Sequence, residues 1–155
     1  TLCIDATPPA APAQPSSDDR TPELSNGSRR IFQALGVWPL LERDATAIRR
    51  IHVSDQGRFA FARIDAEEQG LDALGYVVTN RTMGAALWRC LSESPVKVLA
   101  PARVAQMHLE KGSQRIECLS EEGQSMCVTA ALAVAADGAK SIVREAAGVH
   151  AQTWD

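Results

Sequence analysis

The feature that most limits how this chain can fold is an apolar run that ends in an acidic glycine turn. Residues 131–136 read ALAVAA and contain no polar residue, which is typical of a strand buried on both faces of a sheet. Asp137-Gly138 follows at once and ends the run. Residues 140–147 then predict a helix, which Gly148 stops. A buried strand, a tight turn and a helix in this order predict an α/β connection.

The composition of this turn suits an anionic ligand. A helix that starts at the carboxyl end of a buried strand offers free backbone N–H groups and a favourable dipole to a phosphate. Gly138 permits close approach of the backbone, and Asp137 can accept a hydrogen bond from a hydroxyl or orient a basic group. Arg144 can add charge-assisted contacts. The alternative interpretation is an ordinary connection between a strand and a helix.

A proline-rich segment separates the start of the chain from the rest. Five of the eight prolines lie between Pro8 and Pro22, and proline cannot donate a hydrogen bond to a helix or a sheet. We therefore predict an extended loop or linker over residues 8–26. Residues 1–5, which precede it, predict a short strand that ends in the acid Asp5.

Apolar spacing and capping signals predict three further helical segments. The first covers residues 27–35, carries its apolar residues on one face, and ends at Gly36. Pro39 can open a second, short helical turn. The third helix follows the capping residue Thr79 and is closed by Pro95.

Alternating apolar residues and glycine turns predict a hairpin and a β-meander. The hairpin covers residues 48–63 and turns at residues 55–57, and residues 75–78 predict a separate strand. The predicted meander has strands at residues 96–99, 104–109, 115–119 and 125–129.

Composition excludes several classes of function. The chain has 155 residues, a net charge of −3 and a sequence pI near 5.6, so it lacks the basic surface of a nucleic-acid-binding protein. Its four cysteines form no CxxC pair and have no histidine at ligand spacing, which argues against a zinc site or a redox motif. The longest apolar stretch, residues 128–136, is too short to span a membrane. We predict no metal, no nucleic-acid partner and no membrane span.

The segment Ala136-Asp-Gly-Ala-x-Ser-x-Val-Arg144 resembles the second cofactor motif of the flavoprotein aromatic hydroxylases. Four more segments resemble, in chain order, the ubiquinone-biosynthesis branch of that family, and the resemblance as a whole extends over nearly the whole chain. The resemblance implies an α/β fold: a partial FAD-binding Rossmann-like domain with a β-meander, plus part of a substrate-domain sheet. The four segments are residues 35–38, 51–57, 73–78 and 80–81.

The resemblance also implies which residues bind FAD. It places Asp5 on the adenosine ribose and directs Arg20, in the element Asp18-Asp19-Arg20, and Arg81 toward the flavin nucleotide. Residues 21–23 depart from the small apolar residues that usually follow this element. No catalytic residue and no metal ligand are implied, because the flavin carries the chemistry. The implied cofactor-binding residues are Asp5, Arg20, Arg81, Val104, Asp137, Gly138 and Arg144.

The resemblance implies a division into domains and an incomplete enzyme. Residues 1–45 and 80–155 are expected in the FAD-binding domain, and residues 46–79 in the substrate-domain sheet. The family's glycine-rich phosphate loop would precede Asp5, and its later Gly-Asp motif would follow Asp155. We therefore expect an internal fragment that is inactive alone, binds FAD weakly, and self-associates through open sheet edges.

The implied activity of the whole enzyme is FAD-dependent hydroxylation of a polyprenylated phenol in ubiquinone biosynthesis, with NAD(P)H as the reductant. The resemblance implies a location in the cytoplasm or at the periphery of the inner membrane, with the membrane or a ubiquinone-biosynthesis complex as partner. Two alternatives stay open: another flavin-dependent aromatic hydroxylase, or a non-catalytic binding or assembly module.

Overall fold

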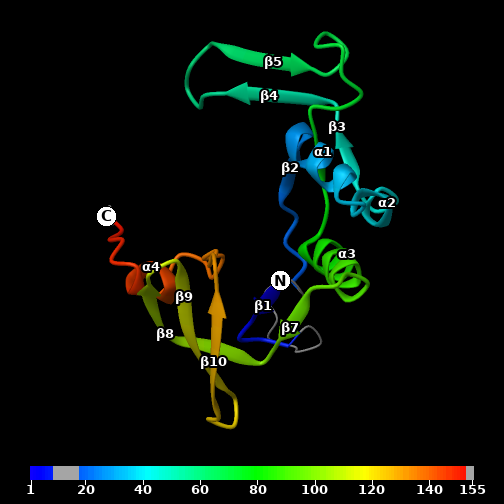
Figure 1. Cartoon of the computed structure of the whole chain (residues 1–155). Helices are drawn as coiled ribbons and strands as arrows, with labels where there is room; N and C mark the ends of the chain where they lie inside the picture. The colour runs from blue at the N-terminus through cyan, green and yellow to red at the C-terminus, as the bar shows by residue number, and fades with distance from the viewer. Residues whose placement is uncertain (9–17, 153–155) are drawn as a thin grey trace. The chain divides into compact units, whose positions relative to one another are not determined.

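The computed structural model describes residues 1–8 and 18–152 (Figure 1). The chain divides into two compact units, which we describe separately. Unit 1 combines Thr1–Ala11 with Val96–Asp155, and unit 2 is Pro12–Pro95. Residues 9–17 of the predicted proline-rich linker lie outside the described residues.

Unit 2 is built on a three-stranded antiparallel sheet in the order β2-β6-β3. Leu24, Tyr76 and Ala47 are paired across the sheet, so they lie on one face. Leu24 and Tyr76 join the apolar core that the helices of this unit complete. The strands are β2 (Glu23–Ser25), β6 (Gly75–Val77) and β3 (Thr46–Ile48). The buried core residues are Leu24, Val37, Trp38, Leu41, Val78 and Ala86.

The first two helices of unit 2 form where the sequence predicts them. The hydroxyl of Ser25 caps helix α1 (Asn26–Ala34), and Gly36 terminates the helix in the left-handed conformation, at φ +73°. Pro39 lies in the first turn of helix α2 (Trp38–Leu41), where its missing N–H is not needed. The predicted helix and the predicted helical turn are both confirmed.

The third helix of unit 2, α3 (Asn80–Ser92), is also confirmed. The Thr79 hydroxyl accepts a hydrogen bond of 3.2 Å from the Thr82 N–H and so caps its first turn. At 13 residues it is the longest of the described helices. None of the helices in the described part of the chain has the length and apolar character needed to cross a membrane.

The apolar face predicted for α1 is only partly buried. Phe32 packs against the core of unit 2. Ile31 and Leu35, which share the predicted face, are 62% and 65% exposed. Helical spacing places these side chains on one face, but which of them is covered depends on where the neighbouring elements lie.

The predicted hairpin is confirmed and consists of strands β4 (Arg50–Ser54) and β5 (Phe61–Asp65). Figure 1 shows these two strands as a sheet of their own, distinct from the sheet of β2, β6 and β3. Gly57, at φ +80°, allows the predicted turn. Phe59, which the predicted bounds place in the second strand of the hairpin, lies in the connection instead and is fully exposed.

Unit 1 contains a parallel pair of strands and an antiparallel sheet. Strands β1 (Leu2–Ile4) and β7 (Lys97–Leu99) form the pair. The second sheet has the order β10-β9-β8, and helix α4 (Ile142–Ala146) packs against β8. Its strands are β8 (Ala102–Glu110), β9 (Ser113–Ser120) and β10 (Ser125–Ala130).

The prediction of a four-stranded meander is wrong for its first strand. Residues 97–99 pair in parallel with β1, and only β8, β9 and β10 form the meander. The sequence pattern identifies a strand but not its neighbour, because pairing depends on residues far away along the chain. The two predicted turns are confirmed, with Gly112 and Gly123 at φ +82° and +78°.

The predicted linker over residues 8–26 is too long. Residues 23–25 form β2, and Asn26 begins α1. The local sequence Glu-Leu-Ser carries no strong strand signal. It forms a strand because it pairs with β6, about 50 residues further along the chain.

The prediction of a buried strand at residues 131–136 is wrong. None of the described strands pairs with this segment, and Leu132 and Val134 are 76% and 79% exposed. A strand needs a neighbour for its backbone N–H and C=O groups, and apolar side chains do not supply one. The helix predicted at residues 140–147 is confirmed as α4, with Gly148 after it at φ +71°.

Candidate functional site

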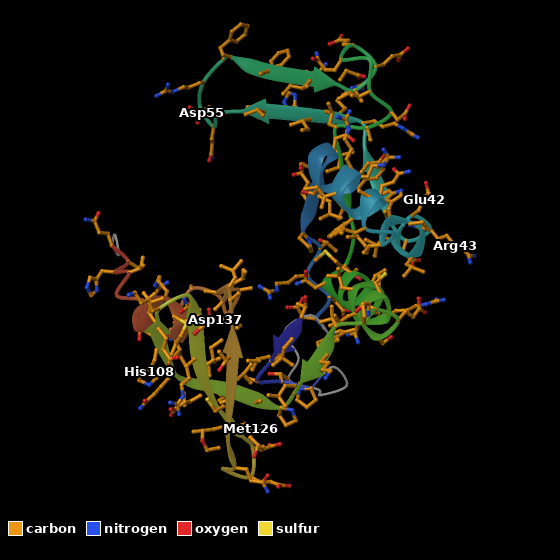
Figure 2. The ribbon with its side chains drawn as sticks, in the orientation of Figure 1. Glu42, Arg43, Asp55, His108, Met126 and Asp137 are labelled. Carbon is orange, nitrogen blue, oxygen red and sulfur yellow. The ribbon has the colours of Figure 1, made fainter. Side chains whose placement is uncertain are left out.

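The Asp137 carboxylate organises the turn that leads into α4 (Figure 2). One of its oxygens accepts a hydrogen bond from the Ser141 hydroxyl, and the other accepts from the backbone N–H groups of Ile142 and Val143, at 2.9 and 3.4 Å. The bond from Ser141, with those from the backbone N–H groups, holds the pKa of Asp137 below its usual value of 3.8. Asp137 is therefore ionised at neutral pH and fixes the shape of the turn.

Gly138 and Arg144 complete this turn. Gly138 adopts φ +83°, a conformation that other residues rarely take, and no atom lies near the position that a Cβ would occupy. Arg144 donates a hydrogen bond of 2.8 Å to the Ala139 carbonyl, while its Nε is buried and has no partner among the described residues. The turn thus combines an open glycine face with a guanidinium that has an unused donor.

Asp5 and Val104 lie elsewhere in unit 1. Asp5 follows β1, and one of its carboxylate oxygens accepts a hydrogen bond of 2.8 Å from the Thr7 N–H. Its second carboxylate oxygen makes no hydrogen bond to residues 1–8 or 18–152 and remains an available acceptor. Val104 is half-buried on β8 opposite Cys118, immediately before a β-bulge.

A second charged cluster lies in unit 2, where the turn at residues 18–20 meets the start of α3. The two carboxylate oxygens of Asp18 accept hydrogen bonds from Asn80 Nδ2 at 2.7 Å and from Arg20 Nε at 2.6 Å. Asp19 accepts from Arg81 Nε at 2.9 Å. Backbone bonds join Asn80 N to the Arg20 carbonyl and Arg81 N to the Asp18 carbonyl, at 2.8 and 3.0 Å. We call these five residues the Asp–Arg clamp.

The clamp holds its acids ionised and leaves its cations accessible. The hydrogen bond from Asn80 lowers the pKa of Asp18, and the bond and charge of Arg81 lower the pKa of Asp19. The side chains of Arg20 and Arg81 are 76% and 61% exposed. Each arginine uses its Nε for the clamp, so its terminal N–H groups can still meet an anion in a forked geometry.

The structure therefore gathers the predicted residues into two groups, one in each unit. Arg20 and Arg81 meet in the clamp, and Asp137, Gly138 and Arg144 meet in the α4 turn. Among the described residues, no hydrogen bond or ion pair joins Asp5 or Val104 to that turn.

Sequence reasoning overlooked two polar partners. Ser141 caps α4 and is 4% exposed, and a serine just before the apolar start of a predicted helix is a recognisable N-cap signal. The bond from Asn80 to Asp18 spans 62 residues, and no local pattern predicts it.

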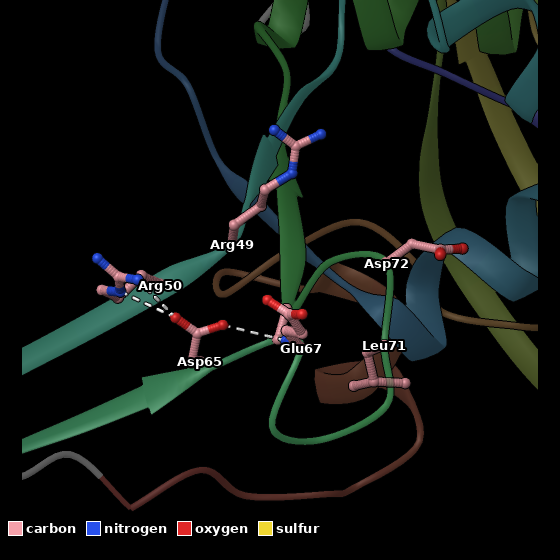
Figure 3. Close-up of a pocket in the computed structure, with 7 residues that line it drawn as sticks. Arg49, Arg50, Asp65, Glu67, Leu71 and Asp72 are labelled. Atoms are coloured by element: carbon pink, nitrogen blue, oxygen red, sulfur yellow. Dashed lines mark hydrogen bonds and ion pairs between the residues drawn. The ribbon is translucent and has the colours of Figure 1, made fainter.

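Unit 2 also has an open cavity of about 470 Å³ at the base of the hairpin (Figure 3). The Arg50–Asp65 ion pair, with a separation of 2.8 Å, lies on one side, and Asp72 lies on another. None of the predicted cofactor residues lines this cavity. Across residues 1–8 and 18–152, no group of three or more histidine, cysteine or acidic side chains is placed to hold a metal ion.

Comparison with known proteins gives a consistent result. The family model described as "FAD binding domain" matches residues 10–155. The chain is 34% identical over 154 residues to the ubiquinone hydroxylase UbiL of Rhodospirillum rubrum, covering 98% of this chain and 34% of that protein. It is 31% identical over 160 residues to the 3-demethoxyubiquinol 3-hydroxylase of Escherichia coli, covering 99% of this chain and 39% of that protein. The chain thus spans little more than a third of either relative.

Solved structures confirm the predicted α/β fold. The p-nitrophenol 4-monooxygenase PnpA of Pseudomonas putida superposes with a TM-score of 0.76 at 16% identity, over 95% of this chain and 37% of that one. The flavin-dependent monooxygenase PieE, solved with FAD and substrate, gives a TM-score of 0.74 at 16% identity, over 95% of this chain and 27% of that one. At this level of identity the likeness concerns the fold alone.

Proposed function

Because this chain belongs to the FAD binding domain family, we propose that it is part of an FAD-dependent monooxygenase that hydroxylates a polyprenylated phenol in ubiquinone biosynthesis. The observation that carries the proposal is similarity along 98% and 99% of the chain to two proteins named as ubiquinone-related hydroxylases. The α/β fold and the two charged clusters support it.

The described residues fit an anionic dinucleotide. The clamp offers the exposed guanidinium groups of Arg20 and Arg81, Arg144 has an unused buried Nε, and Asp5 has a free acceptor oxygen. A pyrophosphate needs cationic donors, and a ribose needs a carboxylate acceptor. The chemistry of this donor and acceptor set therefore suits FAD.

We assign the residues as follows. Asp5 accepts from the ribose hydroxyls, and Arg20 and Arg81 bind the phosphate-bearing part of the cofactor. Asp137 keeps the α4 turn in shape, so that Gly138 permits close approach and Arg144 donates a charge-assisted hydrogen bond. Val104 contributes an apolar contact from β8. When bound and reduced by NAD(P)H, FAD supplies the oxygen activation that hydroxylation requires, while the protein binds, orients and excludes water.

The proposal extends to organisation and location. Residues 1–45 and 80–155 belong to the FAD-binding domain, and residues 46–79 to the substrate-domain sheet. The whole protein works in the cytoplasm, at the periphery of the inner membrane, where a polyprenylated substrate is held.

Purification of the full-length protein tests the proposal. We expect a yellow protein with a flavin spectrum that consumes NAD(P)H and adds one hydroxyl group to a polyprenylated phenol. A flavin-containing protein that hydroxylates only other aromatic compounds would replace the proposed substrate class. A colourless protein that binds no added FAD would favour the binding or assembly module.

A further inference from the structure

Unit 2 contains a second, smaller cavity, which none of the residues assigned to FAD lines. Its volume is about 220 Å³, and it lies between the start of α1 and the loop that joins β5 to β6. The residues that matter here are Asn26, Arg29 and Arg30 on α1, and Leu71, Asp72 and Tyr76 opposite them.

The walls of this cavity are held by the fold. Ala66 and Ala73, at the two ends of the loop, are 3% and 2% exposed. Between them Gly70 adopts φ +64°, and the Leu71 N–H donates a hydrogen bond of 2.9 Å to the Ala66 carbonyl. α1 is fixed opposite by its Ser25 cap. The cavity is therefore formed before any ligand arrives.

The cavity carries an excess of positive charge. Arg29 and Arg30 contribute two guanidinium groups, and Asp72 contributes the single carboxylate of the lining. Within the described part of the chain, neither arginine forms an ion pair with any carboxylate. The two guanidinium groups therefore face the cavity's one carboxylate without a described ion pair that neutralises either of them.

Arg29 is held by aromatic rings rather than by an anion. Its guanidinium carbon lies 5.4 Å from the ring centre of Trp38 and 5.8 Å from that of Tyr76. The Nε of Arg29 is buried and has no hydrogen-bond partner among the described residues. A charged group with an unpaired donor is costly to bury, so an acceptor oxygen beside this guanidinium, in the cavity that Arg29 lines, lowers that cost.

We propose that this cavity binds a small oxyanion, a single phosphate or carboxylate group, held by Arg29 and Arg30. A forked guanidinium matches two oxygens of such a group, and Arg30 supplies a second positive charge. A volume of about 220 Å³ is below the usual range for a drug-sized ligand, so the site suits one small anionic group and not a whole nucleotide. This site goes beyond the proposed function.

Calorimetric titration of the full-length protein, kept saturated with FAD, tests the proposal. The probes are inorganic phosphate and acetate, and saturating FAD prevents either probe from competing at the cofactor residues. We expect one saturable binding event for at least one probe. Phosphate alone would identify a phosphate site, and acetate alone a carboxylate site. Absence of saturable binding for both probes would overturn the proposal.

Matched variants locate the binding event. Arg29→Gln and Arg30→Gln should each weaken binding at least tenfold. Arg43→Gln, at an exposed arginine just beyond α2 that does not line the cavity, should leave the affinity unchanged (Figure 2). Arg30 contacts neither aromatic ring, so Arg30→Gln remains informative even if Arg29→Gln destabilises the fold. Equal weakening by all three variants would show a general charge effect and contradict the site.

Discussion

The α4 turn and the Asp–Arg clamp both use ionised aspartates, but they draw on different parts of the chain. The partners of Asp137 lie four to six residues away, whereas Asp18 and Asp19 each bind a side chain 62 residues away. The first arrangement needs only a short local segment. The second forms only when unit 2 is folded, because α3 must be held against the turn at residues 18–20.

The largest effect should come from a cavity-creating substitution in the core of unit 2. Such a substitution should disrupt the Asp–Arg clamp and leave the α4 turn intact. Leu41 is 0% exposed, and Leu41→Ala should lower the free energy of unfolding by about 2 to 5 kcal/mol. The clamp should be lost with the core, while the hydrogen bonds to Asp137 persist. Denaturant unfolding gives the energy, and hydrogen exchange at Arg81 and Ile142 reports the two arrangements.

The exposed Leu35 provides the control for this experiment. Leu35→Ala, at a side chain that is 65% exposed, should change stability little. If Leu41→Ala accelerated exchange at Ile142 as much as at Arg81, the claim that the α4 turn is local would fail.

Removing the Asp137 side chain tests the local arrangement itself. Asp137→Ala deletes the acceptor for Ser141 and two backbone N–H groups and should destabilise α4 by about 1 kcal/mol. In the full-length enzyme it should weaken FAD or slow flavin reduction roughly tenfold or more, about 1.4 kcal/mol, without global unfolding. Fluorescence titration and stopped-flow reduction measure these effects. Normal flavin content together with normal reduction kinetics would refute the assignment.

The clamp should affect cofactor affinity more than stability. Asp18→Asn and Asp19→Asn remove the charge that orients Arg20 and Arg81, and we expect several-fold weaker FAD binding with little change in melting temperature. Asp65→Asn is the matched control, because the exposed Arg50–Asp65 pair has similar geometry outside the proposed site. An equal loss of FAD affinity in Asp65→Asn would contradict a specific role of the clamp in FAD binding.

Low pH should weaken both the α4 turn and the Asp–Arg clamp. The pKa values of Asp18, Asp19 and Asp137 are lowered in the folded protein from the usual value of 3.8. The stability that the ionised carboxylates contribute is therefore fully present above pH 3.8, and it is lost as the pH falls below 3.8 through the lowered pKa values. Opening free energies from hydrogen exchange at Ile142 should therefore be constant between about pH 5 and 7 and decline below 3.8. Asp137→Asn should abolish this decline at Ile142, and a decline already present near neutral pH would contradict the assignment.

The same contrast explains what could be predicted from the sequence. The caps at Ser25 and Thr79 and the glycine stops at Gly36 and Gly148 are local, and the helices beside them were predicted at the right places. The apolar residues 131–136 look like a buried strand, yet no described strand pairs with them. Strand pairing depends on partners that local patterns do not identify.

The candidate site divides in the same way. The resemblance to a known family predicted Arg20 and Arg81 as cofactor-binding residues, and the sequence pattern predicted the Asp137-Gly138 turn; their role in binding stays a prediction. The sequence did not reveal that Asn80 binds Asp18, because a contact across 62 residues leaves no local pattern. Nor did it reveal the unpaired guanidinium of Arg29, whose place over Trp38 and Tyr76 depends on three different elements.

The central claim is that the clamp presents Arg20 and Arg81 to FAD, and FAD affinity tests it most directly. The dissociation constant of FAD should be measured by flavin fluorescence for the full-length protein, the double variant Arg20→Gln/Arg81→Gln, and the control Arg50→Gln. We predict at least tenfold weaker binding in the double variant and no change in the control. An unchanged dissociation constant in a correctly folded double variant would contradict the account.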